Sequence, residues 1–309
     1  MDPRLFQAFP AEVRDEMESR YVDYCYARFG APDFVARTFE KRETFLETYR
    51  AASHPRWNGD PITQTEFDRY YHGDAPVDEA PELVAWLVRM ARSNAIEGWG
   101  VRYHLDRSHY EREFADGHRP TARALATMQE LYHDELLREA VRLFGLEFEL
   151  HLPGWGMQQM FKSSSYLPEA VGEPLTLVTE IIGSVAFLDM RNRAEVLLAR
   201  DSELLACVRH LIDEVIIDEI GHVTVLLATL NGPQLVAARR ATPIISAVVQ
   251  RFYHRDSRRD GEQLRRDVSR YSLDLFPVEV LQQAFVPEAY WSPRAGSART
   301  SAERVTTAS

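Results

Sequence analysis

The chain has 309 residues, of which 45% are hydrophobic and 27% are charged, enough to bury a sizeable core. Its formal net charge of −11 argues against nucleic acid or an anionic membrane as the main partner, because both favour basic surfaces. Cys25 and Cys207 lie in apolar helical patterns and are interpreted as reduced core residues, which predicts a cytoplasmic protein. We expect neither a signal peptide nor a membrane-spanning run of about 18 apolar residues.

The first eighty residues are predicted to form helices and one long irregular segment. Apolar residues recur at helical spacing over 10–29, and Gly30-Ala31-Pro32 ends that run. A second helix is expected over 33–49. Turn-forming residues then dominate 53–81, with a short helix predicted over 63–71.

Four long helices are predicted in the middle of the chain, beginning near residues 81, 121, 169 and 202. The second is expected to end at Gly145, and Asp201 is the predicted N-cap of the fourth. The segment 147–166, between the second and third helices, is expected to be irregular. These helices predict a bundle core over about 81–230.

The C-terminal part is predicted to add a fifth long helix over 235–253, a polar segment over 255–266, and short helices near 268–275 and 278–285. The composition from residue 292 onward predicts a disordered tail over 292–309. No alternating pattern of useful length indicates strands. We therefore predict an all-α fold with a single domain over 1–291.

Two of the four bundle helices carry a glutamate and a histidine three residues apart, a spacing that places both side chains on one helix face. Each of the other two helices offers a single glutamate on an apolar face. This set, Glu, Glu-x-x-His, Glu, Glu-x-x-His, is typical of four-helix bundles that bind two iron or two manganese ions. The six candidate ligands are Glu97, Glu130, His133, Glu180, Glu219 and His222.

Glu180 carries the most weight among these candidates. No Lys or Arg lies between Leu175 and Met190, and a glutamate in so apolar a segment is rarely buried without a partner. A turn near residue 200 leaves arms of about 30 Å and 27 Å back to Glu180 and Glu219, at a rise of about 1.5 Å per residue. An antiparallel hairpin therefore brings both glutamates to one level.

Several assignments stay open at this stage. The connection after the first bundle helix is long, so Glu111 or Glu113 could replace Glu97 as its ligand, although the apolar face of Glu97 favours Glu97. His104 is either an extra ligand or proton donor, or a satisfied core histidine, and the second interpretation is favoured. Asp218 either hydrogen-bonds a metal-bound histidine or is an exposed helix charge.

These residues and their order resemble the ferritin-like di-iron carboxylate oxygenases over about 81–230. The resemblance implies a four-helix bundle with a dinuclear metal centre held by the six residues named above, extended here by extra N- and C-terminal helices. The layout is similar to that of the bacterial N-oxygenases that convert aryl amines to nitro compounds in natural-product biosynthesis. Those enzymes carry an additional histidine one turn before the last glutamate, where this chain has Val215.

The function expected from this pattern is a non-heme di-iron oxygenase that uses dioxygen to hydroxylate or N-oxygenate a small organic substrate. Electrons would come from a separate reductase, because no flavin, nicotinamide or iron–sulfur signature is found. A homodimer is the default expectation, and manganese stays open as the metal. One alternative is an oxidase like the acyl-carrier desaturases, which would add a carrier protein as partner. Others are a ferroxidase or iron-binding bundle, a helical interaction domain, and a radical generator using Tyr103 or Tyr132.

Overall fold

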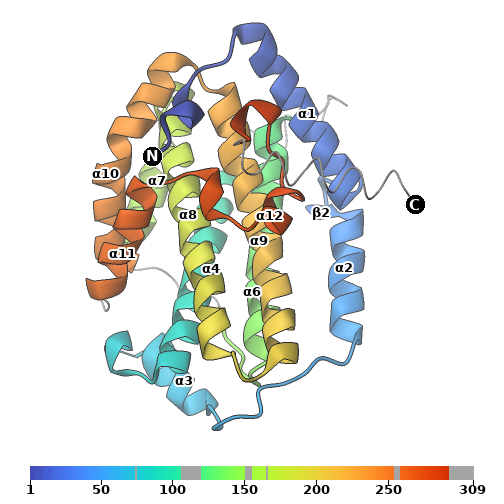
Figure 1. The fold of residues 1–309 in the computed structure, drawn as a ribbon, viewed down its shortest axis with the longest axis vertical. Helices are drawn as coiled ribbons and strands as arrows, with labels where there is room; N and C mark the ends of the chain where they lie inside the picture. The colour runs from blue at the N-terminus through green and yellow to red at the C-terminus, as the bar shows by residue number, and fades with distance from the viewer. Residues whose placement is uncertain (74, 106–119, 150–154, 165, 254–257, 292–309) are drawn as a thin grey trace.

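The computed structural model describes residues 1–73, 75–105, 120–149, 155–164, 166–253 and 258–291 (Figure 1). This part of the chain is mostly helical and has almost no strand, so the predicted all-α class is confirmed. The helices are α1 (Ala11–Phe29), α2 (Glu40–Ala51), α3 (Gln64–Tyr71), α4 (Glu82–Leu105), α6 (Ala122–Arg142), α7 (Trp155–Ser164), α8 (Glu169–Leu197), α9 (Ser202–Thr229), α10 (Gly232–Tyr253), α11 (Arg258–Ser269) and α12 (Val278–Leu281). Short 3-10 turns are η1 (Pro3–Phe6), η2 (Val77–Glu79), η3 (Leu273–Leu275) and η4 (Glu288–Tyr290). The tail predicted over 292–309 lies outside the described residues.

Helices α4, α6, α8 and α9 run along the long axis at the centre of the molecule (Figure 1). Helix α4 packs on α6 and α8, and α9 packs on α6 and α8. Residues 198–201 alone join α8 to α9, so the two helices are antiparallel. The Asp201 carboxylate accepts a hydrogen bond from the Leu204 amide at 3.0 Å, which confirms the predicted N-cap.

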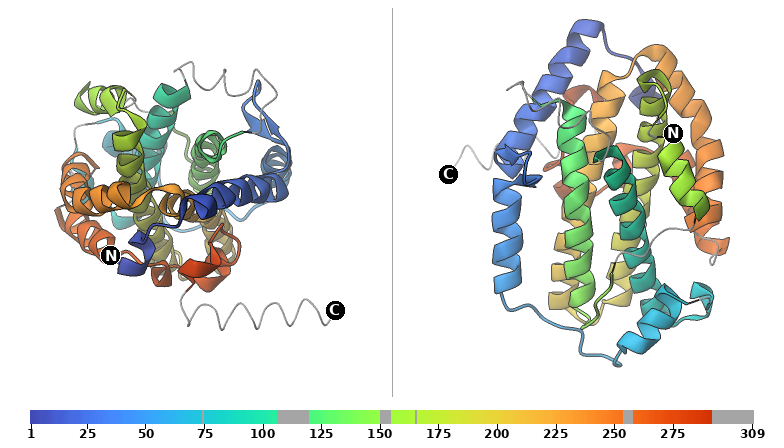
Figure 2. Two further views of the ribbon diagram at one scale, coloured as in Figure 1. Left: turned by 90° about the horizontal axis from the view of Figure 1, so that it is seen from above. Right: turned by 180° about the vertical axis from the view of Figure 1, so that it is seen from behind.

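The remaining helices surround this centre. Helix α1 packs on α9 and α6, α12 packs on α9, and α10 and α11 pack on α8. Helices α1 and α2 lie on one flank, and α10 and α11 lie on the other (Figure 2). Helix α9 is therefore covered on several sides, and every residue from Val215 to Val225 is buried. A helix that is buried all round must satisfy any polar side chain it carries inside the protein.

The prediction of a helix over 33–49 is wrong for its first residues. The chain forms a two-stranded antiparallel hairpin, β1 (Pro32–Asp33) and β2 (Thr38–Phe39), and α2 begins only at Glu40. The Asp33 carboxylate accepts hydrogen bonds from the amides of Val35 and Ala36 at 2.9 and 2.8 Å, which makes a turn. Arg37 follows with a φ of 61°, a left-handed conformation that a helix does not contain.

A segment predicted to be irregular and a segment predicted only to be polar both contain a helix. Helix α7 lies inside the segment 147–166, and α11 covers most of the polar segment 255–266. Over residues 261–269 of α11, where burial is described, the buried residues are Gly261, Leu264 and Val268, at positions that share one helix face. An apolar stripe this narrow is hard to recognise in the sequence, because charged residues surround it.

Among the described residues, one helix is long and apolar enough to cross a membrane by length and composition, Ala170–Leu197. No membrane-spanning segment is predicted from the sequence. Half of its most apolar window is buried inside the protein, as is usual for the core helix of a bundle. The same helix carries Glu180, whose environment is described next.

Candidate metal centre

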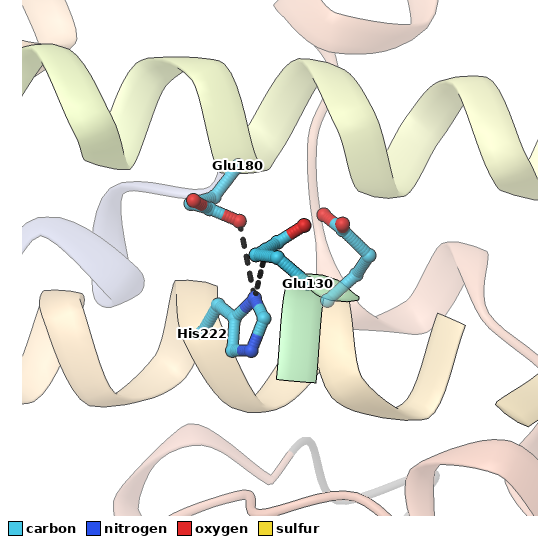
Figure 3. A group of neighbouring side chains, drawn as sticks. Glu130, Glu180 and His222 are labelled. Carbon is cyan, nitrogen blue, oxygen red and sulfur yellow. Dashed lines mark hydrogen bonds and ion pairs between the residues drawn. The ribbon is translucent and has the colours of Figure 1, made fainter. Parts of the chain in front are cut away.

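Three helices bring carboxylates and imidazoles together at the middle of the bundle. Helix α6 supplies Glu130 and His133, α8 supplies Glu180, and α9 supplies Glu219 and His222. Ligand atoms of Glu130, Glu180, Glu219 and His222 all lie within 4.8 Å of one another, so this group could hold a metal ion. Figure 3 shows the carboxylates of Glu130 and Glu180 pointing toward the His222 ring.

The Glu130 carboxylate lies between the two histidines. Its Oε1 is 3.0 Å from His222 Nδ1, and its Oε2 is 3.1 Å from His133 Nδ1. Each histidine also has a glutamate of its own: Glu180 Oε2 is 3.3 Å from His222 Nδ1, and Glu219 Oε1 is 3.5 Å from His133 Nδ1. The cluster thus consists of two carboxylate–imidazole groups that share Glu130.

The register of α8 against α9 follows from their antiparallel packing. Glu180 faces His222, and Gly183, one turn later, faces Glu219. A Cβ atom at position 183 would lie 2.9 Å from Glu219 Oε2, closer than side chains normally allow. Glycine at this position therefore leaves room for the Glu219 carboxylate. Glu180 and Glu219 lie about one turn apart along the helix pair, with ligand atoms within 4.8 Å of each other, close to the common level that the hairpin arms predict.

The cluster is largely shielded from water. His133, Glu219 and His222 are 0–2% exposed, and the side chains of Glu130 and Glu180 are 14% and 18% exposed. Carboxylates so close together in a core repel one another and lose their hydration. Positive charge is therefore required beside them.

In the metal-free chain His222 provides positive charge at this position. Burial opposes ionisation of Glu130, but His133 and His222 hold the pKa of its carboxyl well below the ordinary value. Burial and the neighbouring Glu130 raise the pKa of Glu180. Burial also disfavours the charged form of His222, yet Glu130 and Glu180 outweigh it and raise its pKa to about 10. A proton on His222 thus occupies the place where a metal cation would neutralise the carboxylates.

Each histidine has an acceptor behind its second ring nitrogen. His222 Nε2 lies 2.8 Å from Gln129 Oε1, and His133 Nε2 lies 3.5 Å from Asp218 Oδ2. If Nε2 carries the proton, Nδ1 of each ring is left facing the carboxylates. Metal-bound histidines normally have this arrangement, with one nitrogen on the metal and the other donating to an acceptor.

The alternative of an exposed helix charge at Asp218 is wrong. Its side chain is buried, and Arg42 Nη2 donates to Oδ2 at 2.6 Å. Burial would raise the pKa of this carboxyl, but Arg42 and His133 lower it below its ordinary value. Asp218 therefore stays ionised behind His133.

Three residues around the cluster were not predicted. Gln129 contacts His222, Tyr21 donates to Gln129 Oε1 at 2.7 Å, and Arg42 pairs with Asp218. A glutamine in the apolar stripe of α6, directly before Glu130, was the one local signal available. Arg42 lies among charged residues at the start of α2, and nothing in its local pattern distinguishes it.

The other predicted positions add no described contact to the cluster. The backbone of α4 includes Glu97 and His104, but their side chains lie outside the described part of the chain, as do Glu111 and Glu113 entirely. The Tyr132 hydroxyl donates to Glu43 at 2.6 Å and accepts from the Phe39 amide at 2.7 Å. These contacts tie Tyr132 to β2 and α2.

The chain matches no protein-family model, and neither a curated protein nor a solved structure is significantly similar to it. The arrangement of the side chains is therefore the basis for any assignment. Carboxylate and imidazole donors suit several divalent ions, iron, manganese and zinc among them, so the cluster alone does not name the metal.

Proposed function

We propose that the cluster binds two iron ions and that the protein is a ferritin-like di-iron oxygenase acting on a small organic substrate. The position of Glu130 carries this proposal. Its two oxygens face different histidines, and each histidine has its own second glutamate. A carboxylate shared between two such groups suits a pair of ions better than a single ion.

The residues present fit such a pair. Two divalent cations would offset most of the charge of the clustered carboxylates, which the core otherwise disfavours. Gly183 leaves space at Glu219 that any larger side chain would fill. Both imidazoles face the carboxylates through Nδ1 and have acceptors behind Nε2. Glu97 would complete the set from α4 as the resemblance implies.

The chain's own residues have separable roles in this proposal. Glu130, Glu180, Glu219, His133 and His222 would hold the two ions, with Glu130 offering an oxygen toward each histidine. Bound iron would supply the reduction of dioxygen and the oxidising power for the substrate. Val215 and Phe187 are buried apolar residues, and the Phe187 ring lies 6.3 Å from the His133 ring, so they would keep water from the centre.

Val215 also bears on the choice of reaction. The aryl-amine N-oxygenases that the sequence resembles place a further histidine where this chain has Val215, which is fully buried. A valine cannot bind metal, so the proposal is a hydroxylating or N-oxygenating di-iron enzyme without that extra ligand. A separate reductase would supply the electrons, and a homodimer is the proposed assembly. A desaturase-like oxidase working with a carrier protein is the enzymatic alternative.

Anaerobic loading with Fe(II), followed by an oxygen pulse, tests the proposal. We expect about two irons per chain, an oxygen-dependent optical change, and Mössbauer signals from coupled irons. Glu219→Ala and His222→Ala should each lose iron, whereas Glu203→Ala, an exposed glutamate on the same helix, should retain it. Equal iron content in all four proteins would show that the site is wrong.

The same experiment separates the other functional classes. One iron per chain would contradict the shared role of Glu130. Many irons per chain, with oxygen consumed and no substrate oxidised, would indicate a ferroxidase or storage protein. Two Mn(II) ions bound in preference to iron, or a tyrosine radical after the oxygen pulse, would change the metal or the reaction while leaving the ligand set.

A further inference from the structure

Gln129 lies between His222 and helix α1, and its side-chain amide has three polar neighbours. Its Oε1 is 2.8 Å from His222 Nε2 and accepts a hydrogen bond from the Tyr21 hydroxyl at 2.7 Å. Its Nε2 donates to Cys25 Sγ at 3.7 Å. Gln129 is 1% exposed, and Tyr21 and Cys25 are fully buried, so water does not compete for these contacts.

The orientation of this amide determines which nitrogen of His222 is protonated. Once a metal ion has displaced the second proton of the ring, His222 is neutral, and with Oε1 toward it, as here, its remaining proton stays on Nε2 and Nδ1 keeps its lone pair. With the amide reversed, Nε2 would have to accept, and the proton would sit on Nδ1. Nδ1 is the nitrogen that faces Glu130 and Glu180 at 3.0 and 3.3 Å. A protonated Nδ1 has no lone pair to give to a metal ion.

We infer that Gln129 is a positioning residue of the metal centre, which by accepting a hydrogen bond from His222 Nε2 reserves Nδ1 for the metal, and that α1 supplies Tyr21 to hold Gln129 in this orientation. The inference rests on the proposed metal-binding function. It assigns a role to a helix outside the four central ones, because α1 packs on both α6 and α9.

The surroundings of Tyr21 support a positioning role. The hydroxyl donates to an amide oxygen, which is not a base, so this contact offers no route for the proton that oxidation of a phenol must release. The Tyr21 ring packs edge-on against Phe285, with centroids 5.2 Å apart. A Cβ atom at Gly221 would lie 3.4 Å from the Tyr21 ring, so α9 approaches closely on the other side. The ring is therefore held between α9 and the C-terminal segment.

Gln129→Leu tests the inference, because leucine has a similar size and cannot accept a hydrogen bond. Binding of Zn(II) by the full-length chain is measured by calorimetry, and ¹⁵N NMR of the zinc-loaded chain reports which histidine nitrogen binds the metal. We expect Gln129→Leu to lower the affinity for one of the two bound Zn(II) ions by about 10–100-fold. In the same variant, Nδ1 coordination at His222 should give way to a mixture.

Two further variants serve as comparisons. Gln129→Glu keeps an acceptor toward His222 and should retain both ions with Nδ1 coordination. Met128→Leu conserves volume at the neighbouring buried position and should behave as the parent protein does, so it controls for disturbed packing. Tyr21→Phe removes only the hydroxyl and should shift binding in the same direction as Gln129→Leu by a smaller factor. It provides the test should Gln129→Leu fail to fold.

The outcomes distinguish the inference from the function on which it rests. If the parent binds two ions and Gln129→Leu and Tyr21→Phe both bind them with unchanged affinity and unchanged coordination, the inference is overturned and the proposed function stands. If the parent binds neither zinc nor iron, the proposed function fails, and the role of Gln129 fails with it.

Discussion

The two histidines of the cluster present the same nitrogen to the carboxylates but are supported in different ways. Behind His133 stands a chain of charges: Asp218 pairs with Arg42, and Arg42 also pairs with Glu214. Arg28 continues this chain by donating to Glu214 at 2.9 Å. The carboxylates of this chain belong to α9 and the arginines to α2 and α1, and all four ions are buried or half-buried.

Behind His222 the support is neutral. Gln129 accepts from the ring, and the groups that hold Gln129 are the Tyr21 hydroxyl and the Cys25 thiol. No charged side chain is needed in this set to balance another. His133 is therefore next to an anion, Asp218, that is itself paired with a cation, Arg42. His222 is next to a neutral amide, Gln129, that is held by hydrogen bonds alone.

This difference has an energetic consequence. Removing one partner of a buried ion pair strands the other charge and costs about 3–5 kcal/mol. Removing one partner of a neutral hydrogen bond costs about 1–3 kcal/mol when the remaining group stays buried. Changes behind His133 should therefore affect folding first, and changes behind His222 should affect metal binding first.

The largest expected effect comes from Arg42→Met. Both Asp218 and Glu214 would lose their contact with Arg42, so we expect the free energy of unfolding to fall by about 3–5 kcal/mol. Urea unfolding of the metal-free chain measures this loss, with Arg265→Met on the exposed face of α11 as the control. A loss no larger than that of Gln129→Leu would remove the distinction between the two histidines.

An intermediate effect is expected from Gly183→Ala, which tests the space beside Glu219. The added Cβ would meet Glu219 Oε2 at 2.9 Å, so crowding should cost about 1–3 kcal/mol. Gly172→Ala in the same helix meets no heavy atom closer than 3.8 Å and should stabilise the chain by about 0.5–1 kcal/mol. Equal stabilisation by both alanines, measured by thermal unfolding, would mean that Glu219 has room to move.

The smallest effect is expected from Arg28→Met, at the outer end of the charged chain. The Arg28 side chain is 19% exposed, and Arg42 would still pair with Glu214, so we expect a loss of about 1 kcal/mol or less. Urea unfolding in low and high salt checks this, since solvent and ions should screen much of the pair. If Arg28→Met lowered the free energy of unfolding as much as Arg42→Met does, Arg28 would be the residue that balances the charge of the buried carboxylates.

Much of the central fold was accessible from the sequence because its signals are local. Helical periodicity located α6, α8 and α9, and the Glu-x-x-His spacing placed Glu130 with His133 and Glu219 with His222. The short link between α8 and α9 then determined their register, so Glu180 could be predicted to lie near Glu219. In each case the informative residues are close in sequence or joined by a simple hairpin.

Tertiary packing decided which groups stand behind the histidines. Tyr21 and Gln129 are 108 residues apart, and Arg42 and Asp218 are 176 apart. Contacts over such separations depend on how α1 and α2 lie against α6 and α9, and no periodicity along the chain encodes that placement. The hairpin before α2 is likewise set by one aspartate turn and a left-handed Arg37 rather than by helical propensity. A helix face follows from the order of nearby residues, whereas a buried partner for a polar atom exists only once distant helices have packed.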